Sequence, residues 1–190
     1  MRTAIFGGTF DPIHSAHLEM ARCAADQYRL DRVLFIPAGN PPHKHADASF
    51  EHRYRMVELA CAVDPRFVAS RLEEGAGKSY SIDTIERVRA ANAEVDGPLF
   101  LIIGSDAFAE IQTWRRWQEV IQSVEFVVVG RPGYEITGPP GARVHRLESV
   151  ELPISSSDIR DALARGEMPA ELPPAVGAYI RDHRLYGSAS

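Results

Sequence analysis

Short, continuously apolar runs recur along this chain, and each is followed by a segment whose apolar residues have helical spacing. Continuous apolar runs are typical of strands that are buried on both faces of a sheet. Several of these runs end at a glycine or a proline, as strands that lead into tight turns do. The expected strands are residues 3–6, 33–36, 67–69, 99–103 and 124–129, with a late one at 143–147.

Helices are expected between and after these runs. The helix that begins at residue 50 must stop at Asp64, because Pro65 disfavours helical geometry in the residue before it. A loop rich in glycine, proline and histidine at 38–48 is too long to be a simple connector, and a second loop is expected at 133–141. The expected helices are residues 14–28, 50–63, 81–93, 114–121, 157–165 and 174–183.

This alternation predicts one α/β domain over residues 1–190, a Rossmann-like, doubly wound parallel sheet with a small helical part at about 155–186. No repeat, low-complexity tract or linker divides the sequence. In sheets of this kind the ligand crevice lies beyond the carboxyl ends of the strands. The glycines that follow three of the strands are therefore expected to meet there: Gly7 and Gly8, Gly104 and Gly130.

Charge and cysteine content exclude several classes of function. The chain has 21 basic and 26 acidic residues, a formal net charge of −5, which argues against nucleic acid or a membrane as a partner. Cys23 and Cys61 stand in no metal or redox spacing, so we expect a reduced compartment. No signal peptide fits the first residues, and no apolar run has the length of a membrane span. We expect a cytoplasmic protein with small-molecule substrates, as a monomer or a homo-oligomer.

The segment after the first strand, Gly-Gly-Thr-Phe-Asp-Pro-Ile-His-Ser-Ala-His at 7–17, has the residues of an anion site. Adjacent glycines let the backbone approach a ligand and present amide N–H groups. His14 and His17 share one face of the helix start, where imidazoles and free amides stabilise negative charge. Two other interpretations stay open from the residues alone: a tight turn with structural histidines, and a His-x-x-His metal site. The second lacks a third ligand at a convincing spacing.

A second candidate anion site stands near the other end, in Ile-Ser-Ser-Ser-Asp-Ile-Arg at 154–160. Ser155 and Asp158 fit a capping box, which predicts a helix start with unpaired N–H groups. Capping alone would explain the serines. It does not explain Arg160, because a cation near a helix N-terminus opposes the macrodipole unless an anion is bound.

Together the two segments resemble the paired signatures of the nucleotidyltransferase superfamily that has the (T/H)xGH motif. Further segments narrow the resemblance to bacterial nicotinate mononucleotide adenylyltransferases, and the matches run in order from residue 3 to about 186. These segments are Pro-Pro-His-Lys at 41–44, Ser-Tyr-Ser at 79–81 with Thr84, Ile-Ile-Gly-Ser-Asp at 102–106, Thr-Trp at 113–114 and Gly-Arg-Pro-Gly-Tyr at 130–134.

The resemblance implies transfer of the adenylyl group of ATP to nicotinate mononucleotide by direct in-line attack, giving deamido-NAD and pyrophosphate. It also implies Mg²⁺ as the cofactor, held mainly through the ATP phosphates and by no assigned protein ligand. The catalytic roles fall on His14, His17, Lys44 and Arg160. The residues implied to bind ATP are Gly7, Gly8, Thr9, Phe10, His14, His17, Ser155, Ser156 and Arg160.

The acceptor mononucleotide is implied to bind through a second set of residues. Its pyridine ring stacks on Trp114, its carboxylate is received around Ser81, and Asp106 binds a ribose hydroxyl. A core position for Trp114 and a plain helix cap for Asp106 stay open. The implied acceptor-binding residues are Lys44, Tyr80, Ser81, Thr84, Gly104, Asp106, Trp114 and Arg131.

Two positions depart from the family pattern, and neither removes a charged group. Ala16 stands where the motif has glycine, and Ser81 stands where threonine is common. Three rival functions remain: the same chemistry on the amidated mononucleotide, the same chemistry on phosphopantetheine, and a nucleotide sensor without turnover. Trp114 and the segment 79–81 argue against phosphopantetheine, and the set of expected catalytic cations argues against a sensor. Whether 38–48 closes over the substrates is left open.

Overall fold

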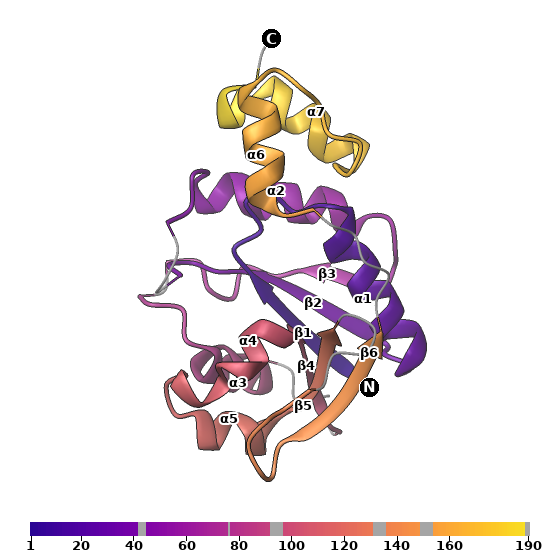
Figure 1. The fold of residues 1–190 in the computed structure, drawn as a ribbon, viewed down its shortest axis with the longest axis vertical. Helices are drawn as coiled ribbons and strands as arrows, with labels where there is room; N and C mark the ends of the chain where they lie inside the picture. The colour runs from indigo at the N-terminus through magenta and orange to yellow at the C-terminus, as the bar shows by residue number, and fades with distance from the viewer. Residues whose placement is uncertain (42–44, 76, 92–96, 131–135, 149–153, 189–190) are drawn as a thin grey trace.

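The computed structural model of the chain describes residues 1–190 apart from 42–44, 76, 92–96, 131–135, 149–153 and 189–190 (Figure 1). The described residues include a six-stranded sheet with the strand order β3-β2-β1-β4-β5-β6, in which every pair of neighbours is parallel. The strands are β1 (Thr3–Gly8), β2 (Arg32–Pro37), β3 (Phe67–Ala69), β4 (Leu99–Gly104), β5 (Glu125–Gly130) and β6 (Arg143–Glu148).

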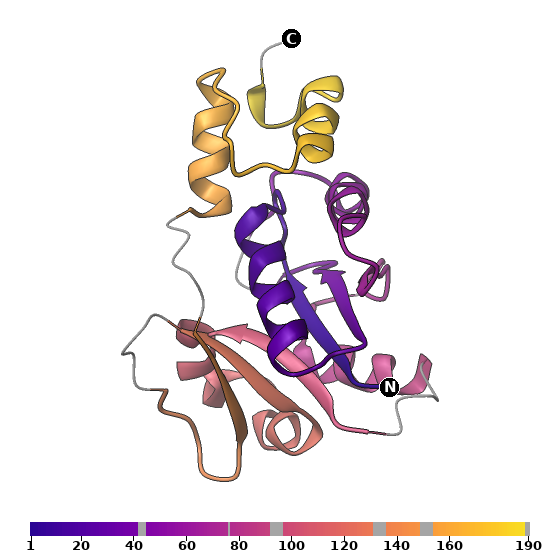
Figure 2. The same ribbon diagram turned by 90° about the vertical axis from the view of Figure 1, so that its right-hand side faces the viewer.

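Helices lie on both faces of the sheet (Figures 1 and 2). One face carries α1 and α2, the other carries α3, α4 and α5, and α6 and α7 lie together next to α2. The helices are α1 (Ser15–Gln27), α2 (Phe50–Cys61), α3 (Ser81–Ala91), α4 (Ser105–Ala109), α5 (Trp117–Ser123), α6 (Ser156–Ala164) and α7 (Pro174–Asp182), with the 3₁₀ turns η1 (Ile111–Thr113) and η2 (Leu185–Gly187).

Successive residues of each central strand are buried on opposite faces of the sheet. In β1, Ala4 and Phe6 join the core under α1 and α2, whereas Ile5 joins the core under α3 and α5. Phe100 and Leu101 of β4 are divided in the same way. Burial on both faces is the reason that these strands are continuously apolar in sequence. The expected doubly wound parallel sheet is therefore confirmed.

The expected helix over 114–121 is wrong at its start. Trp114 has an extended backbone (φ −75°, ψ 147°) and ends η1, and Arg116 is left-handed at φ 53°. Helix α5 therefore begins only at Trp117. The short helix α4 and the turn η1 that follows it were not expected, because Phe108 and Ile111 are their only buried residues.

The C-terminal helices share a core with the helices on the α1 and α2 face. Ile159 of α6 and Ile180 of α7 are fully buried in the same cluster as Val57 of α2 and Ala21 of α1. This packing holds the end of the chain close to the loop that follows β1. Among the described residues, no helix has both the length and the apolar character needed to cross a membrane.

Candidate active site

The order in which the chain adds strands to the sheet reverses between β1 and β4. From β1 the chain moves outward through β2 to β3, and it then returns to β4 on the other side and continues to β6. β1 and β4 pair only through Thr3–Ile5 and Leu99–Leu101, although each strand continues for three more residues. The two strands thus separate toward their carboxyl ends, and this is where a doubly wound sheet binds its ligand.

The glycines that end the strands lie at this edge of the sheet, as expected. Gly7 and Gly104 are exposed, and Gly104 is in register with Val129, the residue before Gly130. A Cβ atom at Gly130 would lie 3.9 Å from the Cβ of Ser105, the residue after β4. The ends of β4 and β5 are therefore adjacent, and the end of β1 faces them across the point of divergence.

The β1–α1 loop, residues 9–14, is held in shape by the buried ring of Phe10. This residue has a left-handed backbone (φ 50°), and its ring lies against Phe6, Phe35 and His17 at centroid distances of 5.1–5.9 Å. A Cβ atom on Gly8 would approach the Phe10 ring to 3.1 Å, which explains the glycine at that position. Phe10 therefore shapes the loop, and its ring is 2% exposed.

His14 and His17 meet at the start of α1. His14 is the N-cap residue, its backbone N–H donates to His17 Nδ1 (3.3 Å), and the two rings are 3.8 Å apart. Burial lowers the pKa of His14 to about 4, so that the ring is neutral at physiological pH. His14 is thus suited to donate a hydrogen bond to an anion, and it does not supply a positive charge.

The N-terminus of α6 packs directly on the β1–α1 loop. Ser155 and Asp158 form the expected capping box: Ser155 Oγ accepts from Asp158 N (3.2 Å), and the carboxylate accepts from Ser155 N (2.9 Å). The hydrogen bonds from Ser155 hold the pKa of Asp158 below its usual range. Ser156 Oγ donates to the carbonyl oxygen of Pro12 (2.9 Å). Two segments at opposite ends of the sequence therefore form one surface.

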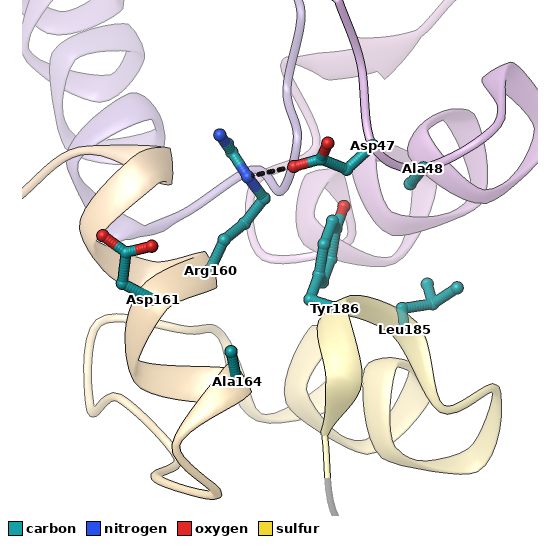
Figure 3. Close-up of a pocket in the computed structure, with 7 residues that line it drawn as sticks. All are labelled: Asp47, Ala48, Arg160, Asp161, Ala164, Leu185 and Tyr186. Carbon is teal, nitrogen blue, oxygen red and sulfur yellow. Dashed lines mark ion pairs between the residues drawn. The ribbon is translucent and has the colours of Figure 1, made fainter.

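Arg160 lies against the same loop. Its Nη1 donates to the Asp11 carbonyl oxygen (2.9 Å), and its Nε pairs with the Asp47 carboxylate (2.6 Å). Figure 3 shows Arg160 pointing toward the segment that carries Asp47, with Tyr186 beside it. A pocket of about 390 Å³ adjoins these side chains, and it is lined by Asp47, Ala48, Arg160, Asp161, Ala164, Leu185 and Tyr186.

The carboxylate of Asp11 is buried under this surface and joins three parts of the chain. It is 3% exposed and accepts hydrogen bonds from Asp47 N (2.6 Å), Ala48 N (3.2 Å) and the Tyr186 hydroxyl (2.6 Å). Burial, followed by the hydrogen bond to Asp11, raises the pKa of Tyr186 far above its ordinary value. The hydroxyl is therefore a permanent donor.

Arg53 of α2 connects the β1–α1 loop with the end of the 38–48 loop. Its Nη1 donates to the Thr9 carbonyl oxygen (2.8 Å), and its Nε donates to that of Ala48 (3.2 Å). The residue is 2% exposed, and this burial lowers its pKa against the opposing effect of nearby Asp11. A buried cation in this position fixes the backbone of both loops.

On the acceptor side, the structure places Tyr80 and Trp114 against the core under α3 and α5. Both are partly buried at the edge of that cluster, and the guanidinium of Arg115 lies 4.8 Å from the Tyr80 ring centroid. Ser81 begins α3 and is partly buried as well. Thr84 is 6% exposed, and its hydroxyl donates to the carboxylate of Glu73. The Thr84 hydroxyl is thus used in a hydrogen bond inside the protein.

Asp106 is exposed in the first turn of α4, and Gly104 is the N-cap residue of that helix. The interpretation of Asp106 as a plain cap is therefore wrong, and its carboxylate lies just beyond β4, at the carboxyl edge of the sheet. Lys44 and Arg131, which are expected to bind the acceptor mononucleotide, lie outside the described residues. Their roles stay predictions.

Comparison with known proteins agrees with this arrangement. A family model described as cytidylyltransferase-like matches residues 5–162. A protein of Solibacter usitatus (strain Ellin6076), named "Probable nicotinate-nucleotide adenylyltransferase", is 59% identical over 188 residues, 98% of this chain and 100% of the relative. A Thermus thermophilus protein of the same name is 43% identical over 188 residues, with the same coverage. The chain belongs to the nicotinate-nucleotide adenylyltransferases of this family.

Solved structures show the same fold for this adenylyltransferase. The structure of "Plasmodium falciparum nicotinic acid mononucleotide adenylyltransferase complexed with NaAD" superposes with a TM-score of 0.81 at 18% identity, and it covers 99% of this chain and 98% of its own. The same protein complexed with APC gives a TM-score of 0.79. The relatives and the family model thus confirm the family expected from the sequence motifs, and the solved structures confirm the fold.

Three polar residues of the adenylyltransferase site were missed by reasoning from its sequence: the carboxylates of Asp11 and Glu73, and the Tyr186 hydroxyl. All three act through hydrogen bonds between distant segments. Arg53 was missed too, although it shares a helix face with the buried Met56, and a cation on an apolar face is a usable signal of a buried polar network.

Proposed function

We propose that this adenylyltransferase joins ATP to nicotinate mononucleotide, forming deamido-NAD and releasing pyrophosphate. One observation carries the proposal: the β1–α1 loop and the N-terminus of α6 form a single surface through the Ser156–Pro12 and Arg160–Asp11 hydrogen bonds. Each segment alone could bind a single anion. Because the two segments meet where the strand order reverses, between β1 and β4, together they can bind the several phosphates of ATP.

In the proposed mechanism, a phosphate oxygen of the mononucleotide attacks the α-phosphorus of ATP. The new bond to the α-phosphorus forms as the bond to the β-phosphate oxygen breaks, and pyrophosphate leaves on the side opposite the attack. No protein nucleophile is involved, so the chain contributes positioning and charge stabilisation. The backbone amides of Gly7 and Gly8, with Thr9 and Phe10 beside them, would approach the triphosphate.

The side chains contribute to positioning and charge stabilisation in different ways, according to their charge. His14, neutral through burial, donates a hydrogen bond to a phosphate oxygen. His17 acts on the charge that develops in the transition state. Arg160 holds the leaving pyrophosphate from the α6 side, together with the backbone of the helix N-terminus, where Ser155 is the N-cap and Ser156 the first helical residue. Lys44 would add a cation from the loop. Preorganised donors of this kind are worth about a hundredfold or more each in rate.

Mg²⁺ is part of the same proposal. The groups assigned to the triphosphate are backbone amides, imidazoles and a guanidinium, which donate to phosphate oxygens and are poor ligands for Mg²⁺. Among the described residues, no group of three acidic, histidine or cysteine side chains could hold a metal ion. These residues fit an ion whose ligands are phosphate oxygens and water. When bound, Mg²⁺ would neutralise charge on the departing pyrophosphate.

Selectivity for the acid over the amide is assigned to Ser81 and Trp114. The start of α3 offers a hydroxyl and free backbone N–H groups to a carboxylate, and Trp114 offers a ring face to the pyridine. Asp106 would accept from a ribose hydroxyl, and Tyr80, Gly104 and Arg131 would complete the acceptor site. Thr84 supports this site through Glu73.

The test is pyrophosphate release from ATP and Mg²⁺ with nicotinate mononucleotide, its amide and phosphopantetheine as parallel acceptors. We expect a strong preference for the nicotinate form. Equal use of the amide would contradict the assignment of Ser81, and turnover only with phosphopantetheine would contradict the acceptor. His17→Ala should lower kcat about a hundredfold or more while the KM for ATP changes less.

We also propose a cytoplasmic location, small molecules as the only substrates, and one folding domain over residues 1–190. The core shared by α6, α7 and α2 supports the last point. A single unfolding transition, seen alike by circular dichroism and tryptophan fluorescence, would agree with one domain, whereas two separate transitions would not.

A further inference from the structure

Tyr186 stands near the end of the chain, yet its hydroxyl reaches the buried carboxylate that follows Phe10. It donates to Asp11 Oδ1 at 2.6 Å across 175 positions of sequence. The same oxygen accepts from Ala48 N at 3.2 Å, and the other carboxylate oxygen accepts from Asp47 N at 2.6 Å. Without Tyr186, Oδ1 would keep only the longer of its two bonds.

Asp11, Asp47 and Arg160 form a closed network, which we call the Asp11 network. The Asp11 carboxylate fixes the backbone of Asp47, the Asp47 carboxylate pairs with Arg160 Nε, and Arg160 Nη1 returns to the Asp11 carbonyl oxygen. Figure 3 shows the side chains of Arg160 and Tyr186 both pointing toward the Asp47–Ala48 segment. Nothing in the mechanism above requires Asp47 or Tyr186.

We propose that Tyr186 is a positioning residue for the phosphate site, which acts through the Asp11 network to orient Arg160. The inference rests on the proposed function, since it assigns Arg160 to the pyrophosphate part of ATP. A guanidinium has five N–H donors. Partners among the described residues take three of them, at Asp47, Asp11 and, at 3.5 Å, Ser157. No other described residue takes the remaining two, which we assign to phosphate oxygens, and the network determines which way they point.

Loss of the Tyr186 hydroxyl should therefore weaken binding of the pyrophosphate part of ATP. Asp11 and the backbone at 47–48 would gain freedom, and Arg160 would be less often in the orientation that meets a phosphate. Affinity for ATP and for pyrophosphate should fall together. The acceptor mononucleotide should be much less affected, because Tyr80 and Trp114, two of its expected residues, pack on the α3 and α5 face of the sheet.

The first experiment compares Tyr186→Phe with the matched control Tyr179→Phe. Tyr179 of α7 also makes a hydrogen bond between helices, with its hydroxyl 2.9 Å from His52 Nδ1, but it is not part of the Asp11 network. We expect Tyr186→Phe to raise the KM for ATP, and the KM for pyrophosphate in the reverse reaction, by about three- to tenfold. The KM values for both mononucleotide-containing substrates should stay within twofold, and Tyr179→Phe should leave all four unchanged.

A merely structural role gives a different result. It would lower the fraction of active enzyme and the midpoint of thermal unfolding in both variants, with every KM unchanged, and that outcome would overturn the proposal. Equal KM increases for all substrates would overturn it as well.

The second experiment tests the route through Arg160 by measuring the binding of α,β-methylene-ATP, a non-reactive analogue, by calorimetry. Tyr186→Phe should weaken binding about three- to tenfold in the wild-type background, and by less than twofold in the Arg160→Ala background. The same loss in both backgrounds would refute the route. This measurement needs no turnover, so it tests the role of Tyr186 even if the wild-type enzyme makes no deamido-NAD. Absence of deamido-NAD would count against the proposed function instead.

Discussion

His14 should make this enzyme lose stability on mild acidification. Its pKa is about 4 in the folded protein because of burial, against 6.5 for a free histidine. Between these two values the unfolded chain binds a proton that the folded chain does not, and the free energy of unfolding therefore falls as the pH is lowered. The stability contributed by neutral His14 is complete above pH 6.5 and is lost progressively toward pH 4.

The size of this effect follows from the two pKa values. Each pH unit over which only the unfolded chain carries the proton is worth about 1.4 kcal/mol. Relative to pH 7, His14 should cost about 2 kcal/mol at pH 5 and about 3 kcal/mol at pH 4. Native stabilities are about 5–15 kcal/mol, so this loss is measurable by urea unfolding.

Other groups also titrate in this range, and the assay therefore compares the wild-type enzyme with His14→Asn. Asparagine is a good N-cap residue and has no charge to gain. The difference in unfolding free energy between the two proteins should shift by about 3 kcal/mol from pH 7 to pH 4, in favour of the variant at acid pH. A difference that stays constant over this range would refute the burial argument, whatever the absolute stabilities are.

Three further predictions concern other residues. Arg53→Met should lower the free energy of unfolding by about 3–5 kcal/mol, because it leaves the Thr9 and Ala48 carbonyl oxygens buried without their charged donor; urea unfolding measures this, and a change below 1 kcal/mol would contradict it. Gly39→Ala would place a Cβ atom 2.0 Å from the Glu73 carbonyl oxygen, so the backbone must move, at a cost of about 1–3 kcal/mol; a thermal midpoint equal to that of the wild type would exclude this. Trp114→Ala should raise the KM for nicotinate mononucleotide by about three- to tenfold and leave that for ATP unchanged, which steady-state kinetics would show; the reverse pattern would remove Trp114 from the acceptor site.

The fold could be predicted from sequence because burial on two faces leaves a simple pattern. A strand such as residues 99–103 has no polar position, so it fits only the middle of a covered sheet. The start of α5 could not be predicted in this way. Its helical spacing continues back to Trp114, and the interruption depends on the left-handed backbone of Arg116, which no side-chain preference announces.

The candidate site was predictable where its residues stand in short motifs. The β1–α1 loop and the start of α6 each show glycine, histidine or serine in a local arrangement that indicates anion binding. The groups that join these segments were not predictable. Asp11 and Tyr186 are far apart in sequence, and neither has a neighbour that suggests its partner.

Hydrogen bonds at both ends of the 38–48 loop link the phosphate side of the site to its acceptor side. At its start, Gly39 N donates to the buried Glu73 carboxylate, which also accepts from Thr84 on the acceptor side. At its end, the backbone at 47–48 donates to Asp11 on the phosphate side. Apolar contacts tolerate sliding, whereas a buried carboxylate that loses a donor is costly. The two ends of the loop are therefore fixed, one against each half of the site. A change in the Glu73 carboxylate should first weaken binding of the acceptor, and a change in the Asp11 carboxylate should first weaken binding of ATP.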